Sequence, residues 1–225
     1  MLPEPKRQKS AQVLMRYRQA LPQFVFDASA LEGNPFTFPE VKMLMVGISV
    51  GGRKLSDENQ VLNLSRAAHH LLDLIEQGDF TLSKATSDAL HVRLAKEEAL
   101  EWGHFRGQGS EATFTPTVSL GNFPAYKPLP TMSGGGNLLA LYQEGLDALV
   151  AQVSNPLERG LAYFLFGALH QFYFDGNKRT ARFMMNGVFM SHGLDAISVP
   201  AARAQEFNEK MVIIILNGKG NIFLY

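Results

Sequence analysis

The chain has 225 residues, and the 46% of them that are hydrophobic can form the core of one domain, or of a main domain with an extension. Its 21 Lys and Arg residues balance 21 Asp and Glu residues, which excludes an overall charge that would attract nucleic acid or a membrane surface. The absence of cysteine excludes disulfides and thiolate metal sites.

No apolar run is long enough to span a bilayer, and the N-terminal residues lack the apolar stretch of a signal peptide. Only Lys6, Arg7 and Lys9 approach a basic stripe, and a solvated tail explains them better than nucleic-acid binding does. We therefore expect a cytoplasmic protein that binds neither nucleic acid nor a membrane.

The N-terminal part of the chain favours helices. A first helix is predicted from Ser10 to Pro22, and a second, short one ends near Leu31. Gly33 and Pro35 follow it, and these residue types are typical of a helix C-terminus and of the residues just beyond it.

Three more helices are predicted before residue 103. Pro39, in a first helical turn, opens a segment through Met45. Apolar residues spaced three and four apart predict a helix over residues 61–75, which Gly78 ends. Alanines at similar spacing predict a longer amphipathic helix over residues 83–102.

Residues 113–130 change to short β-like pieces separated by Gly121 and by prolines. They predict a β-hairpin, which taken alone would be an ordinary surface hairpin. A run of three glycines, 134–136, then serves as a linker into a helix over residues 137–153.

The C-terminal part is predicted to hold three helices. An Asn-Pro pair at 155–156 starts a helix that is apolar on nearly all sides and ends at His170. The next helix stops at Gly193, and a third covers residues 206–216. Residues 217–221 are predicted to turn into a short terminal strand or tail.

The loop between the first two of these helices combines residues that suit a nucleotide phosphate. Gly176 and Asn177 allow a sharp turn that points backbone N–H groups outward at a helix start, where an anion is favoured. Arg179 and Arg182 are three residues apart, so they share a helix face and could grip neighbouring phosphate oxygens. Three cations in a first helical turn oppose the helix dipole, which favours an anion-binding site over a merely solvated turn.

Two further residues of the loop supply chemistry. Asp175 is a hard oxygen ligand of the kind that holds Mg²⁺ bridging phosphates. His170 can take up a proton near neutral pH. The other histidines show no metal-ligand spacing and are interpreted as ordinary core or surface residues.

Residues 170–182 resemble the motif of the Fic family, His-x-Phe-x-(Asp/Glu)-Gly-Asn-Gly-Arg-x-x-Arg. Most members transfer AMP from ATP to a target hydroxyl, and the Doc toxin branch transfers the γ-phosphate instead. The resemblance implies that His170 is the general base and Asp175 the Mg²⁺ ligand. It also implies that Asn177 and Arg179 hold the α- and β-phosphates and that Arg182 holds the γ-phosphate, with Gly176 and Lys178 completing the phosphate-binding set.

This chain departs from the motif at two places. Tyr173 and Phe174 both stand between the Phe and the acid, where the family has one residue. We interpret this as one inserted residue that the loop absorbs; if the helix carried it, His170 would rotate by roughly 100° away from the phosphates. Lys178 stands where most members have Gly, and the phosphotransferase branch has a similar Asn-Lys-Arg.

A second segment resembles the inhibitory motif (Ser/Thr)-x-x-x-Glu-(Gly/Asn) of Fic proteins. Here Glu32 is followed by Gly33, and Ala28 replaces the hydroxyl residue, although Ser29 is adjacent. In members with this motif on the N-terminal side, the glutamate pairs with the last motif arginine and occupies the γ-phosphate space. The resemblance thus implies that Glu32 pairs with Arg182 and inhibits the protein.

The resemblance implies an all-α, mainly helical Fic fold with a small β-hairpin flap at residues 113–130 that holds a target segment. We divide the chain into an N-terminal extension (1–24), a Fic domain (25–195) and a C-terminal helix and tail (196–225). The leading hypothesis is a protein AMP transferase that uses ATP and Mg²⁺ to modify a Ser, Thr or Tyr hydroxyl of an unidentified target protein. A Doc-like phosphotransferase and a degenerate nucleotide-binding regulator are the alternatives, and a homodimer is left open.

Overall fold

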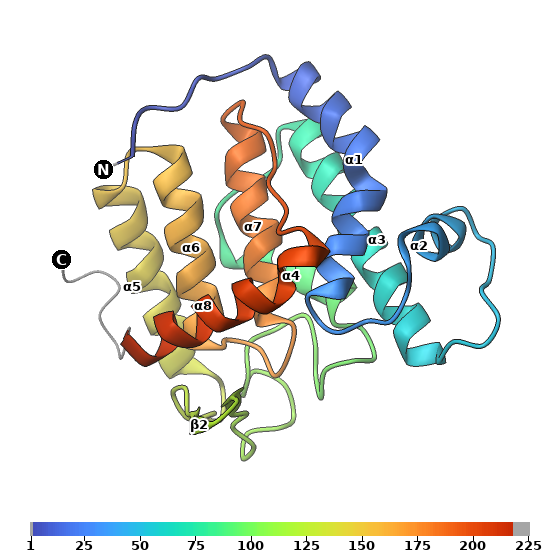
Figure 1. Ribbon diagram of the computed structural model, residues 1–225. Coiled ribbons are helices and arrows are strands. Elements are labelled where there is room, and N and C mark those ends of the chain that lie inside the picture. The colour runs from blue at the N-terminus through green and yellow to red at the C-terminus, as the bar shows by residue number, and fades with distance from the viewer. Residues whose placement is uncertain (1, 218–225) are drawn as a thin grey trace.

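Two neighbouring antiparallel helices, α6 (Pro156–His170) and α7 (Asn177–Ser191), form the centre of the fold (Figure 1). The structure is a computed structural model, and it describes residues 2–217. α6 begins where it was predicted to, because the side chain of Asn155 accepts hydrogen bonds from two free N–H groups of the first turn. Almost all of α7 is buried, so the loop that joins the two helices rests on a rigid base.

Six further α-helices in the described part of the chain surround this pair. They are α1 (Ser10–Ala30), α2 (Phe38–Met45), α3 (Leu55–Gln77), α4 (Lys84–Leu94), α5 (Gly136–Gln152) and α8 (Ala204–Asn217). α5 packs against α6, whereas α1, α3 and α4 contact α7, and α2 packs on α1 and α3. α8 lies against both central helices through Met211, which clusters with Phe164 and Phe189.

α1 is one helix where two were predicted. It continues through Pro22, although proline lacks the N–H that would bond to the preceding turn. Tyr17, Leu21 and Val25 are buried on both sides of the proline, so packing of the whole face outweighs the lost hydrogen bond. α1 therefore runs without a break across residues 24 and 25, where the sequence suggested a domain boundary.

α4 is shorter than predicted, because it ends at Leu94 instead of continuing to residue 102. Glu97 has a φ of 62°, which a helix interior does not allow. The resulting turn brings Glu98 against Arg179 of α7. A contact with a distant helix thus overrides the local pattern of alanines.

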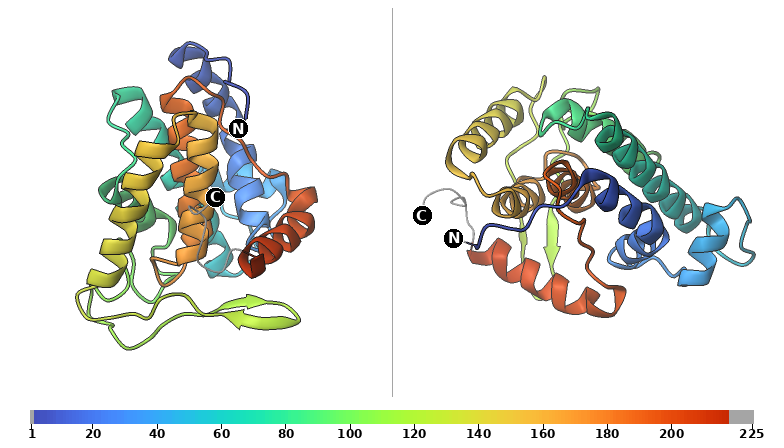
Figure 2. Two further views of the ribbon diagram at one scale, coloured as in Figure 1. Left: turned by 90° about the vertical axis from the view of Figure 1, so that its left-hand side faces the viewer. Right: turned by 90° about the horizontal axis from the view of Figure 1, so that it is seen from above.

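Two short strands form the hairpin that was predicted within residues 113–130. β1 (Val118–Leu120) and β2 (Phe123–Tyr126) pair antiparallel. Leu120 packs with Leu169 of α6 and Ile215 of α8, so the hairpin covers the end of α6 that leads into the loop (Figure 2).

The other helix predictions are confirmed, including the end of α3 at Gly78, which takes a left-handed conformation. The mainly helical fold with a two-stranded hairpin agrees with the predicted fold class. The terminal strand or tail predicted after residue 217 lies outside the described residues. No helix within residues 2–217 is long and apolar enough to cross a membrane.

Candidate functional site

The loop between α6 and α7 is closed by Asn177, the first residue of α7. Its Oδ1 accepts a hydrogen bond from the Tyr173 N–H (2.9 Å), and its Nδ2 donates to the Tyr173 carbonyl (2.8 Å). Gly176 has a φ of 70°, and a Cβ there would lie 3.4 Å from the Cβ of Ala95, so glycine suits this position. The loop thereby presents the free N–H groups and the positive dipole end of α7.

The start of α7 lines a cavity of about 510 Å³, a size typical of small-molecule sites. Five residues predicted from the sequence line it: Asp175, Gly176, Asn177, Lys178 and Arg179. Glu32, the hairpin and α8 contribute to the rest of the wall. The structure therefore gathers four of the five predicted phosphate-binding residues, together with Asp175 and Glu32, around one space. The fifth, Arg182, is not part of the lining and contacts Glu32 instead.

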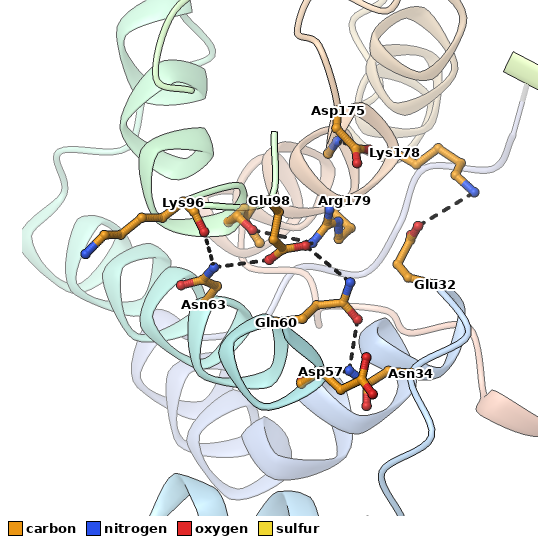
Figure 3. A network of polar contacts seen from close by, with 12 residues as sticks. Glu32, Asn34, Asp57, Gln60, Asn63, Lys96, Glu98, Asp175, Lys178 and Arg179 are labelled. Atoms are coloured by element: carbon orange, nitrogen blue, oxygen red, sulfur yellow. Dashed lines mark hydrogen bonds and ion pairs between the residues drawn. The ribbon is translucent and has the colours of Figure 1, made fainter. Parts of the chain in front are cut away.

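Glu32 lines the cavity among three cations. Its Oε1 accepts a hydrogen bond from Nη2 of Arg182 at 3.1 Å. The Nζ of Lys178 lies 4.0 Å from Oε2 of Glu32 (Figure 3). Burial raises the pKa of Glu32, but the charges of Arg182, Lys178 and Arg179 outweigh it and hold the pKa below its ordinary value. The Glu32–Arg182 contact expected from the resemblance is therefore present, with Glu32 ionised.

Arg179 is paired with a carboxylate that the sequence did not point to. Its Nη1 lies 2.6 Å from Oε2 of Glu98, which also accepts hydrogen bonds from Asn63 and Gln60 of α3 (Figure 3). Burial lowers the pKa of Arg179, but the surrounding carboxylates raise it above its ordinary value. Nothing near Glu98 in the sequence marks it, because its partners come from α3 and α7.

Asp175 is exposed at the cavity wall, and its Oδ1 accepts a hydrogen bond from the Gly176 N–H (2.6 Å). Within residues 2–217, no group of three or more His, Cys, Asp or Glu side chains could form a complete metal cage. One carboxylate beside a phosphate-binding helix start still fits Mg²⁺, which takes one or two carboxylates together with substrate phosphates.

His170 is the last residue of α6 and Gln171 follows it, and the two side chains contact different parts of the structure. The ring of His170 packs against Phe166 and Phe172, with centroid distances of 4.9 and 5.8 Å, and burial lowers its pKa. Gln171 follows in a left-handed conformation, with a φ of 50°. Of the described residues that line the cavity, Gln171 is one and His170 is not. The ring of His170 therefore packs on aromatic side chains and is not part of the cavity lining.

Arg106 joins the loop to the base of the hairpin. Its side chain is completely buried, and it donates from Nε to the Gln171 carbonyl (2.7 Å), from Nη1 to Oγ1 of Thr131 (2.6 Å) and from Nη2 to the Leu129 carbonyl (3.1 Å). Burial lowers its pKa to about 10, so it stays a cation near neutral pH. It therefore fixes the backbone where α6 meets the loop.

His91 supports the loop from α4. Its Nδ1 accepts a hydrogen bond from the Gly103 N–H (2.9 Å), so its Nε2 carries the proton that bonds to the Asp175 carbonyl (2.9 Å). Its ring stacks on Tyr173 at 3.8 Å. Burial lowers its pKa to about 4, which keeps it neutral. It is an ordinary buried histidine with its hydrogen bonds satisfied, as the sequence suggested.

Comparison with known proteins identifies the fold. No family model matches the chain. A structure of Fic-1 from C. elegans matches with a TM-score of 0.73 at 20% identity, covering 93% of this chain and 60% of that one. A Fic domain containing signaling protein from Bacteroides thetaiotaomicron matches with a TM-score of 0.73 at 16% identity, covering 88% and 72%. The fold is that of the Fic domain proteins.

Curated relatives match most of the chain at low sequence identity. The protein adenylyltransferase Fic of Drosophila grimshawi is 25% identical over 197 residues, which cover 84% of this chain and 37% of the relative. The protein of that name from Drosophila yakuba is 24% identical over 212 residues, which cover 91% and 39%. This chain is similar to these Fic proteins in sequence, and it spans less than half the length of the curated relatives.

Proposed function

We propose that this protein binds Mg-ATP in the cavity and transfers AMP to a Ser, Thr or Tyr hydroxyl of a target protein, with Glu32 restraining the reaction. The observation that carries the proposal is the ionised carboxylate of Glu32 held among Arg182, Lys178 and Arg179. A pocket that holds one oxyanion by several cations also suits a phosphate. The relatives, named protein adenylyltransferases, suggest the reaction.

The phosphates would bind at the start of α7. Free N–H groups and the helix dipole attract an anion there. Arg179 lines the cavity, and its buried Nε has no hydrogen-bond partner among residues 2–217, so a phosphate oxygen would satisfy it. Asp175 would hold Mg²⁺, and the bound ion would neutralise charge on the phosphates.

In the proposed reaction, the target hydroxyl oxygen attacks the α-phosphorus of ATP. The bond from that phosphorus to the oxygen bridging to the β-phosphate breaks, and pyrophosphate leaves. The hydroxyl proton must pass to a base or to water. The resemblance implies that His170 accepts this proton, but the ring of His170 packs against Phe166 and Phe172 and is not part of the cavity lining.

Glu32 would inhibit by occupying an anion position. While its carboxylate pairs with Arg182, a phosphate cannot use that guanidinium, and the two negative charges would repel each other. ATP binding in the reactive orientation therefore requires Glu32 to move. The hairpin at residues 113–130 would hold the target segment beside the cavity, which β1 helps to line.

The position of His170 favours a second function, in which the protein binds the nucleotide without transferring any part of it. Lys178 lines the cavity and stands at the position where most members of the family have glycine. Because the phosphotransferase branch has a similar Asn-Lys-Arg, transfer of the γ-phosphate is a variant of the first function. The reaction products separate these possibilities.

The test is mass spectrometry of the Glu32→Gly protein after incubation with ATP and Mg²⁺, beside a calorimetric titration of Mg-ATP. An AMP adduct, or release of pyrophosphate, supports adenylyl transfer. A phosphate adduct would replace it with phosphotransfer. Binding without any product would support the second function, and no binding would contradict both. Glu144→Gly, a change at an exposed residue of α5, is the control for the loss of a glutamate.

A further inference from the structure

We propose that Gln171, and not His170, is the side chain that faces the reacting phosphates, so the cavity holds a nucleotide without a general base beside it. This inference rests on the proposed function, because it concerns the same cavity. It identifies the residue that limits the rate of transfer and the single substitution that would raise it.

The spacing within the loop supports this assignment. In the motif, the histidine lies five residues before the first glycine and the phenylalanine lies three before it. Without an insertion, the same count from Gly176 reaches Gln171 and Tyr173. Asn177 hydrogen-bonds both the N–H and the carbonyl of Tyr173, which fixes the distance between Tyr173 and the helix start. The extra residue therefore belongs to α6.

The side chain of Gln171 is held at the cavity wall. Its Oε1 accepts a hydrogen bond from Nδ2 of Asn177 (3.1 Å), and its Nε2 donates to the carbonyl of Ala168 (2.6 Å). Arg106 holds its backbone carbonyl. Two hydrogen bonds thus fix the side-chain amide beside the phosphate-binding helix start, and a third fixes the backbone of the same residue.

His170 cannot take this place without breaking those contacts. One residue step along a helix corresponds to a rotation of roughly 100°. Turning the end of α6 by that amount would pull Gln171 away from Asn177 and Arg106, and would remove the ring of His170 from Phe166 and Phe172. The packing of the aromatic core therefore keeps His170 where it is.

The chemical consequence follows from the amide group. An amide can hydrogen-bond a phosphate or a hydroxyl, but it does not take up a proton near neutral pH. A positioned general base contributes about 10²–10⁴-fold to such a reaction. In the native chain the attacking hydroxyl would lose its proton to water, while in Gln171→His the imidazole would accept it as the new O–P bond forms and pyrophosphate leaves.

The experiment compares Glu32→Gly with the double variant Glu32→Gly/Gln171→His. Pyrophosphate release from Mg-ATP is followed with water as the acceptor, so no target protein is needed, and Mg-ATP affinity is measured by calorimetry. We expect Gln171→His to raise the rate by about 10²-fold at similar affinity. The gained rate should rise with pH through about 6.5, as expected for an imidazole base.

The triple variant that adds His170→Phe keeps an aromatic ring in the core and should retain this gain. The inference is overturned if Gln171→His binds Mg-ATP without a gain in rate, or if His170→Phe removes the transfer activity of the Glu32→Gly protein. Absence of Mg-ATP binding in all variants would instead overturn the proposed function, and the inference with it.

Discussion

Two regions hold the arginines of α7, and they do so in different ways. At the end of α4, residues 91–98, Glu98 binds Arg179 and is itself held by two side chains of α3. At the end of α1, Glu32 binds Arg182, with Lys178 at 4.0 Å as its next cation. The carboxylate of Glu98 is thus held by two neutral amides as well as by a cation, whereas the carboxylate of Glu32 contacts cations alone. The first arrangement is suited to permanent positioning, and the second to displacement by a competing anion.

The end of α4 also fixes the loop backbone. His91 bonds the carbonyl of Asp175, and Arg179 donates weakly to the carbonyl of Leu94 (3.4 Å). No comparable bond from residues 29–34 to the loop backbone is present within residues 2–217. A ligand that displaces Glu32 would therefore meet a loop that is already in place.

Removal of Glu98 should have the largest effect on stability. Glu98→Ala leaves the guanidinium of Arg179, which is 3% exposed, without its charged partner, and breaking a buried ion pair in this way costs about 3–5 kcal/mol. The free energy of unfolding from urea titrations measures this loss. A loss equal to that of Glu144→Ala, at an exposed residue, would show that Arg179 does not depend on Glu98.

The second effect is a loss of stability in acid that depends on His91. Its pKa of about 4 in the folded state is below the ordinary 6.5, so as the pH falls the unfolded chain binds a proton first. Stability should therefore fall between about pH 6.5 and pH 4, by about 3 kcal/mol for this group, and not further below pH 4.

His91→Phe, which keeps a ring to stack on Tyr173, tests this origin. The variant should lose stability at neutral pH because it lacks both hydrogen bonds, yet its stability should change less between pH 6.5 and pH 4. Urea titrations at several pH values measure both. An unchanged pH dependence would assign the acid sensitivity to other groups.

Local sequence patterns predicted the site residues that lie close together in the chain, but not the contacts between residues that are far apart in it. Gly176, Asn177 and Arg179 come from one short segment at the start of α7, so their common location follows from local geometry. Glu98 reaches Arg179 only because the chain leaves the helix at Leu94, and alanine spacing favoured continuing that helix. Long-range contacts decided this point, and local patterns cannot reveal them.

The place of His170 illustrates the same limit. The sequence allowed the extra residue to lie in the loop or in the helix. Arg106, which is far away in the chain, holds the carbonyl of Gln171, and on our proposal this contact favours the helix. The Glu32–Arg182 contact could be expected from the resemblance alone; its inhibitory role remains a prediction.

The smallest expected effect on stability is that of Glu32→Gln, and it sharpens the contrast with Glu98. The side chain of Glu32 is 19% exposed, and solvent can partly replace it around Arg182, so we expect a loss of about 1 kcal/mol at neutral pH. Because its folded-state pKa is lowered, the contribution of Glu32 is present above about pH 4.3 and lost as the pH falls below it. The difference between native protein and variant should therefore shrink in acid.

Mg-ATP should stabilise the Glu32→Gln variant more than it stabilises the native protein. A ligand that binds only the folded state at 100 times its Kd stabilises it by about 2.7 kcal/mol, and Glu32→Gln frees Arg182 for a phosphate. The variant should therefore gain more stability from Mg-ATP than the native protein does, whereas Glu144→Gln should gain the same amount as the native protein. Equal gains in Glu32→Gln and native protein would mean that Glu32 does not compete with the nucleotide, and that both carboxylates, Glu32 as well as Glu98, are structural.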